Sequence, residues 1–139
     1  MSATVEPSVL SRATSELRLT AQPSQLGLAR DYARAAAAVF GFDDERCYEV
    51  VCAFNEAVTN AIRHGRPDER GQIDLSVESN NERLTLAVRD YGKFVACAVA
   101  ATPSSEGGRG FALMAALMDN IELRISPAST TVCLSKDRV

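Results

Sequence analysis

Apolar and polar residues alternate in five short segments of the chain, which is the period expected of strands that have one buried face. We therefore predict strands at residues 15–21, 71–79, 82–90, 120–126 and 130–135. Asn80 and Asn81 separate the second strand from the third as turn residues, which predicts a hairpin. Parallel strands buried on both faces would be continuously apolar instead. The sequence thus predicts an α/β two-layer sandwich, with a mixed, largely antiparallel sheet and all helices on one face.

Helical periodicity appears in the segments between these strands. Residues 24–40 predict a long helix that ends at Gly41. A second helix is expected to begin at Asp43 or Asp44 and to run through the sequence FNEAVTNAIRHG. A third, shorter helix is expected at residues 110–120, after a loop rich in Ala, Ser and Gly.

The second helix carries a polar pair in apolar surroundings. On a helical wheel, seven apolar residues share the side that should pack on the sheet: Cys47, Val50, Val51, Phe54, Val58, Ala61 and Ile62. Glu56 and Asn60, one turn apart, point together away from that side. An ordinary solvated surface would explain the pair. The small neighbours Ala53 and Ala57, and the poor helix propensity of Asn, favour a site that something else approaches.

A Glu beside an Asn can serve phosphate chemistry. The side-chain oxygen of Asn60 can ligate Mg²⁺, a cation that binds substrate phosphates. The carboxylate of Glu56 can orient or deprotonate a hydroxyl nucleophile. This chemistry requires a nucleotide, and a nucleotide requires further contacts.

Two later motifs contain candidate contacts for a nucleotide. Asp90 ends a strand and is followed by Gly92; its carboxylate could accept a hydrogen bond from the exocyclic amine of adenine, or could close an Asx turn. Gly107, Gly108 and Gly110 precede a helix, where backbone N–H groups can bind phosphate, although a flexible loop would explain them too. The sequence contains neither a P-loop nor a dinucleotide-binding motif.

Composition narrows the range of functions. The 139 residues suffice for one domain, which we place at residues 15–139 after a flexible tail at 1–14. The net charge of -3 argues against direct nucleic-acid binding as the main function. No apolar run has the length of a membrane span and the N-terminus lacks a signal-peptide pattern, so we expect a cytoplasmic protein. The four cysteines have no metal-ligand spacing with the single His64, and we expect buried free thiols.

The three motifs, in this order, resemble those of the histidine-kinase-like ATPase superfamily, also called the GHKL or Bergerat fold. NEAVTNAIRHG is similar to its N box, DYG to its G1 box and GGRGFALM to its G2 box. Their order and spacing, and the small size of the chain, are most similar to the bacterial anti-sigma-factor serine/threonine kinases. The resemblance covers about residues 15–135 and implies a mixed sheet with helices on one face, in agreement with the strand pattern.

The resemblance also implies roles for individual residues. Glu56 matches the general base, Asn60 the Mg²⁺ ligand, and Asp90 the acid that reads adenine. The other positions that match nucleotide contacts are Gly92, Gly108, Arg109 and Gly110. For Arg109, a phosphate contact and a solvated lid side chain are equally compatible with the motif. Residues 93–107 would form the lid.

Three positions qualify this match. Phe94 stands where many members have a second G1 glycine, so the motif does not fix the shape of the pocket at this edge. Phe111 stands where Leu is usual, and it is still apolar. His64 ends the N box, where we expect it to cap the helix or pack rather than react.

Proteins of this family bind a sigma factor, phosphorylate a Ser or Thr of an antagonist protein, and are often homodimers. The resemblance therefore implies an ATP-binding, Mg²⁺-dependent protein serine/threonine kinase and anti-sigma factor in transcription regulation, without direct contact with nucleic acid or membrane. The alternative is a nucleotide-responsive partner-binding module without significant kinase activity. The intact pair of Glu56 and Asn60 favours the kinase. A two-component sensor kinase is not expected, because no dimerisation helix with a phospho-accepting His precedes the domain.

Overall fold

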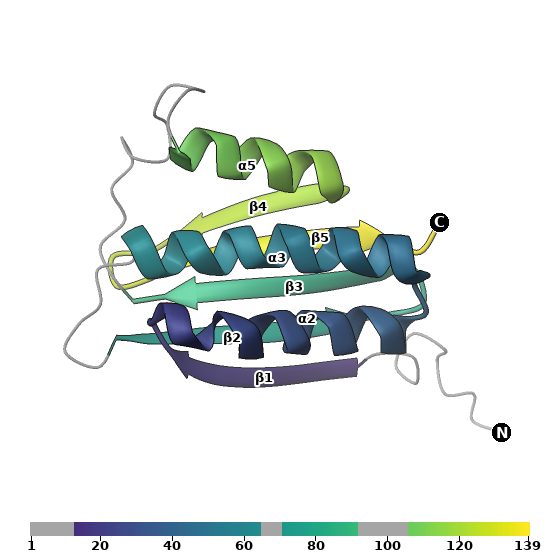
Figure 1. Ribbon diagram of the computed structural model, residues 1–139, viewed down its shortest axis with the longest axis horizontal. Helices are drawn as coiled ribbons and strands as arrows, with labels where there is room; N and C mark the ends of the chain where they lie inside the picture. The colour runs from purple at the N-terminus through teal and green to yellow at the C-terminus, as the bar shows by residue number, and fades with distance from the viewer. Residues whose placement is uncertain (1–12, 65–70, 92–105) are drawn as a thin grey trace, which may run out of the picture.

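The computed structural model describes residues 13–64, 71–91 and 106–139 (Figure 1). Within these ranges, five strands form one open sheet in the order β1-β2-β3-β5-β4. They are β1 (Ala13–Thr20), β2 (Gln72–Ser79), β3 (Arg83–Asp90), β4 (Asn120–Ile125) and β5 (Thr130–Asp137). All neighbouring pairs are antiparallel, and the helices cover one face of the sheet (Figure 1). The predicted two-layer sandwich is confirmed, and the sheet is antiparallel throughout its described strands.

The helix layer begins and ends where local sequence signals place its boundaries. It contains the short 3-10 helix η1 (Pro23–Gln25) and the α-helices α2 (Leu26–Phe40), α3 (Asp44–His64) and α5 (Glu106–Leu117). Gly41 terminates α2 in the left-handed conformation, with a φ of 108° that a side chain would disfavour. Asp43 caps α3, because its Oδ1 accepts a hydrogen bond from the Arg46 N–H at 2.9 Å.

The core lies between the sheet and the helices. Alternate residues of β2 and β3 face the helices and are buried: Ile73, Leu75, Val77, Leu84, Leu86 and Val88. Val50, Phe54 and Val58 of α3 are fully buried against them, which confirms the apolar stripe predicted for this helix. α2 presents small residues to the core, which let it lie close to its neighbours: Ala29, Ala33 and Ala37.

Several element boundaries differ from those expected; among them, α5 ends at Leu117 rather than at residue 120, and β5 extends to Asp137 rather than ending at residue 135. β1 begins at Ala13, so two residues assigned to the N-terminal tail pair with β2. α5 begins at Glu106 rather than Gly110, so the predicted loop is shorter at this end. Glycine is tolerated in a first helical turn, where the N–H groups have no intrahelical partner.

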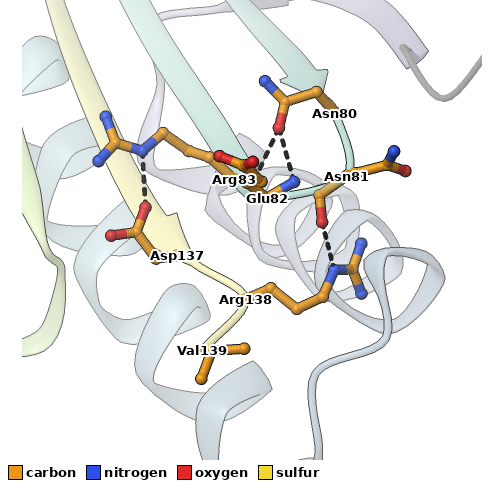
Figure 2. A pocket seen from close by; sticks show the side chains of 7 residues that line it. All are labelled: Asn80, Asn81, Glu82, Arg83, Asp137, Arg138 and Val139. Carbon is orange, nitrogen blue, oxygen red and sulfur yellow. Dashed lines mark hydrogen bonds and ion pairs between the residues drawn. The ribbon is translucent and has the colours of Figure 1, made fainter. Parts of the chain in front are cut away.

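The end of the sheet with the β2–β3 turn contains a cavity of about 520 Å³ (Figure 2). Asn80 closes the turn, because its Oδ1 accepts hydrogen bonds from the N–H groups of Glu82 at 2.8 Å and Arg83 at 2.9 Å. Arg83 in turn pairs with Asp137 at 2.7 Å. These contacts attach the turn to the end of β5.

Arg138 connects this turn to the helix layer. Its Nε donates to the Asn81 carbonyl at 2.6 Å, and another guanidinium nitrogen donates to the Phe40 carbonyl at 2.6 Å. The guanidinium also lies 3.9 Å from the centroid of the Phe40 ring. A positive charge at the C-terminus of α2 interacts favourably with the helix dipole. Arg138 therefore joins α2, the β2–β3 turn and the end of the sheet.

We predict that Arg138→Met lowers the free energy of unfolding by about 1–2 kcal/mol, because two carbonyls lose a charged donor. Equilibrium urea unfolding would measure the loss. Arg124→Met is the matched control, since Arg124 pairs only with the exposed Glu122 of its own strand, and its loss should stay within about 0.5 kcal/mol. Equal losses in the two variants would contradict a connecting role for Arg138.

Candidate nucleotide site

Glu56 and Asn60 lie in the half of α3 that faces the start of α5. Gly110 of α5 packs directly on the pair: a Cβ at this glycine would lie 3.2 Å from Asn60 Nδ2 and 3.4 Å from Glu56 Oε2. The N-box helix and the glycine-rich segment, 50 residues apart at their closest contact, thus meet in the fold. Of the predicted site residues, the structure brings these three together.

The polar face of α3 is not an ordinary solvated surface. Ala53 and Ala57, the two small residues beside the pair, are 0% and 1% exposed. Asn60 Nδ2 is buried and has no hydrogen-bond partner among the described residues. A buried amide donor without a partner costs roughly 1–3 kcal/mol of desolvation. Such an atom is typical of a position where a ligand or an ordered water completes the hydrogen bonds.

Asp90 lies at the last position of β3, on the side of the sheet that the helices cover. It lies two residues after the buried Val88 and therefore on the same face of the sheet. Its backbone is paired with Thr130, the first residue of β5. Thr130 is 5% exposed, and its Oγ1 is buried without a hydrogen-bond partner among the described residues. An acid and a buried hydroxyl therefore lie on adjacent strands at one end of the sheet.

The sequence patterns did not single out Thr130. Its signal was a hydroxyl residue at an inward position of a strand whose next inward residues are Val132 and Leu134. The pairing with Asp90 follows from the β3–β5 register, which a single sequence does not contain.

All these pieces lie at one end of the molecule, opposite the β2–β3 turn (Figure 1). The end of β3, the start of β5, the later half of α3 and the start of α5 converge there. Gly108 and Arg109 belong to the first turn of α5. Gly92, the other predicted nucleotide contact, lies outside the described residues, as do most of the expected lid and Phe94.

The end of β3 is held from the opposite face of the sheet. Tyr91, directly after Asp90, donates a hydrogen bond to Asp74 of β2. Arg18 of β1 also donates to Asp74, at 2.7 Å. These two hydrogen bonds, that from Arg18 above all, hold the pKa of the Asp74 carboxyl below its usual value despite some desolvation. The strand that carries Asp90 is thereby attached to β1 and β2.

Other chemistry has little support in the described part of the chain. Its cysteines, Cys47, Cys52 and Cys133, are free thiols, as predicted, but only Cys133 is buried and the other two are partly exposed; Cys97 lies outside it. No three His, Cys, Asp or Glu side chains gather there as a metal site. Nor is any helix there long and apolar enough to cross a bilayer. Phe111 packs against the core, so this departure from the usual Leu preserves an apolar contact.

The family model for the histidine kinase-like ATPase domain matches residues 19–136. The chain belongs to this family. The ATPase domain is 29% identical over 134 residues to the serine-protein kinase RsbW of Bacillus velezensis, with 87% of this chain and 83% of that protein covered. It is 27% identical over 125 residues to the anti-sigma F factor of a Thermoanaerobacter species, with 84% and 87% covered. Its relatives are thus anti-sigma-factor and serine-kinase proteins.

Solved structures share the fold of the ATPase domain. The structure of the RsbU and RsbW domains of Rv1364c from Mycobacterium tuberculosis matches 90% of this chain with a TM-score of 0.67 and 21% identity, and the match spans 33% of that longer chain. The SiaB-SiaC complex from Pseudomonas aeruginosa contains a chain that matches with a TM-score of 0.60 and 10% identity, with 88% of this chain and 89% of that chain covered.

We predict that Gly110→Ala destabilises the domain. The helix gains roughly 0.5–1 kcal/mol from the exchange, but overpacking against Asn60 and Glu56 costs about 1–3 kcal/mol. Gly27→Ala in α2 is the matched control, since its Cβ would meet only Arg30, at 3.8 Å. Urea unfolding should show a lower stability for the first variant and an unchanged or higher stability for the second. A stabilising Gly110→Ala would mean that α5 does not pack closely on the pair.

We also predict an acid-sensitive contribution from Asp74. Because its pKa is lowered on folding, the stability it contributes is present above the ordinary pKa of about 3.9 and is lost as the pH falls below that value. Urea unfolding at pH 5 and near pH 3 should show a larger loss for the parent than for Asp74→Asn. Equal losses would show that the carboxylate is not stabilised by Arg18 and Tyr91.

Proposed function

We propose that the chain is a Mg²⁺-ATP-dependent protein serine/threonine kinase and an anti-sigma factor, which phosphorylates a Ser or Thr of an antagonist protein. One observation carries the proposal: Gly110 of α5 packs on the Glu56–Asn60 pair, and Asn60 Nδ2 is buried without a hydrogen-bond partner among the described residues. An acid and an amide beside a helix N-terminus are the groups that phosphate transfer requires. The printed names of the relatives, serine-protein kinase and anti-sigma F factor, support the same activity.

The available groups fit a magnesium-bound nucleotide. Mg²⁺ usually keeps several waters and takes one or two protein oxygens together with substrate phosphates, so Asn60 Oδ1 alone would suffice as its protein ligand. When bound, the ion would neutralise charge on the phosphates. The backbone N–H groups of the first turn of α5, that of Gly108 among them, lack an intrahelical acceptor and would bind phosphate oxygens, because a residue without a side chain lets the backbone approach closely. Gly110, in the second turn, would contribute by letting α5 lie close to Asn60 and Glu56. Arg109 would add a charged donor.

The adenine ring would lie at the other end of the nucleotide from the phosphates. Asp90 would accept a hydrogen bond from the adenine amine, and Thr130 beside it would supply a hydroxyl to the same group or to a bridging water. Gly92 would leave room for the ring. This arrangement favours adenine over guanine, which presents a carbonyl oxygen where adenine presents the amine.

Glu56 would act on the protein substrate. Its carboxylate would align the Ser or Thr hydroxyl with the γ-phosphorus and accept the hydroxyl proton as the new O–P bond forms. The bond from the γ-phosphorus to the bridging oxygen would break, and ADP would leave. Positioning and charge neutralisation supply most of the rate in such transfers.

The partners follow from the proposed activity. A sigma factor would be held inactive, and the antagonist would be both competitor and phosphate acceptor. We further propose a cytoplasmic homodimer, as expected for a regulator of this kind. No helix in the described part of the chain is long and apolar enough to cross a bilayer. The net charge of -3 argues against direct nucleic-acid binding as the main function.

Calorimetric titration with ATP and ADP, with and without Mg²⁺, tests the nucleotide site. The parent should bind saturably, and Asp90→Asn should bind much more weakly, because the neutral amide replaces one of the two carboxylate acceptors with a donor. Glu56→Gln should retain ATP affinity within about threefold, yet lose about 10²- to 10⁴-fold in transfer of labelled phosphate to an antagonist protein.

The outcomes separate the alternatives. Binding without transfer in the parent would indicate the nucleotide-responsive binding module instead of the kinase. Absence of nucleotide binding in the folded parent would refute both. Full transfer by Glu56→Gln would refute the role of Glu56 alone. Gly27→Ala is the control for general effects of substitution in the helix layer, since Gly27 lies in α2.

A further inference from the structure

An ion pair between a buried lysine and a partly exposed glutamate, whose side chain is 33% exposed, lies two helical turns from the proposed nucleotide site. Lys136 of β5 is 7% exposed, and its Nζ lies 3.1 Å from Oε1 of Glu49 in α3. The same Nζ donates to the Leu117 carbonyl at 2.6 Å. One ammonium group therefore connects the sheet, the central helix α3 and the last residue of α5.

Stability alone does not explain a lysine at this position. Position 136 continues the inward row of Val132 and Leu134 on β5, where an apolar residue would also be buried. Removing an ammonium from water is costly, and a buried ion pair is often no more stable than a well-packed apolar replacement. The ammonium instead makes directional contacts, because its N–H groups bind one particular carboxylate and one particular carbonyl.

The end of α5 is fixed to β5 by other contacts too. The Asp119 N–H donates to the Ser135 carbonyl at 2.9 Å, and the Asp137 N–H donates to Asp119 Oδ2 at 2.7 Å. The positive charge of Lys136 also suits the C-terminus of a helix, where carbonyls are unsatisfied. α5 thus has a fixed C-terminal end.

α3 and α5 are joined by Lys136, which contacts Glu49 and Leu117, and by the packing of Gly110 on Glu56. These two places have the same spacing on both helices. Glu49 precedes Glu56 by seven residues, and Gly110 precedes Leu117 by seven residues. Seven residues are about two helical turns, or about 10.5 Å. The helices run antiparallel (Figure 1), so the ion pair fixes one end of their contact and the site occupies the other.

We infer that the Lys136–Glu49 pair sets the register of α5 along α3. It thereby sets the position of Gly110 relative to Glu56 and Asn60. The inference rests on the proposed function for its consequence, although the register itself can be tested without a nucleotide. Neither Lys136 nor Glu49 reaches the site. They act through the rigid helices, and a shift of about 1 Å at a reacting group can cost as much as 10²-fold in rate.

Lys136→Met tests the register in the protein without nucleotide. The side-chain amide resonances of Asn60 in a ¹⁵N correlation spectrum report on the contact with Gly110. They should move in Lys136→Met and, to a smaller extent, in Glu49→Gln, which removes the charge but keeps an acceptor. Arg138→Met, destabilised at the opposite end of the molecule, should leave them in place. Unchanged Asn60 resonances in a folded Lys136→Met would overturn the inference.

Titration of the same variants with Mg²⁺-ATP and ADP tests the consequence. Lys136→Met should weaken Mg²⁺-ATP about tenfold and ADP less than about threefold, because the third phosphate is the group nearest the start of α5. Arg138→Met should preserve the ratio of the two affinities. Equal weakening in both variants would show a purely structural role for Lys136. If the parent binds no nucleotide, the proposed function fails, and the Asn60 resonances still decide the register.

Discussion

The close approach of α5 to α3 is the contact on which the candidate site depends. It is possible because the facing residues are small: Ala53 and Ala57 are buried on α3, and Gly110 has no side chain at all. Any larger residue at Gly110 would meet the functional groups of Glu56 and Asn60 at 3.2–3.4 Å. A polar pair that would otherwise face solvent is thereby partly covered by α5.

The two ends of the sheet differ in how completely their polar groups are satisfied. At the β2–β3 turn, the Asn80 side chain and the Arg138 guanidinium each have hydrogen-bond partners. At the other end, Asn60 Nδ2 and Thr130 Oγ1 are buried without partners among the described residues. Buried polar atoms are normally satisfied. The contrast sets the turn end apart from the end at which the family motifs lie.

The lysine at the end of β5 links these two roles. Lys136 places an ammonium group inside the protein, where it binds Glu49 and the Leu117 carbonyl. An apolar residue could make neither contact. Such a pair adds direction more than stability. Because α5 meets α3 through small residues, we infer that the contacts of Lys136 set the position of Gly110 along α3.

The sequence by itself determined the sandwich, the end of a helix at Gly41 and the three motifs, since each depends on local periodicity or on a few adjacent residues. It left Asp43 and Asp44 open as the start of α3, and the hydrogen bond from the Arg46 N–H to Asp43 decided between them. It also indicated Glu56 and Asn60 as a pair, because i and i+4 share a helix face. Only the tertiary structure placed Gly110 on that pair and Thr130 opposite Asp90, because strand register and helix packing join residues that are distant in the chain. The buried contacts of Lys136 were decided in the same way, by pairing between distant segments that no local pattern encodes.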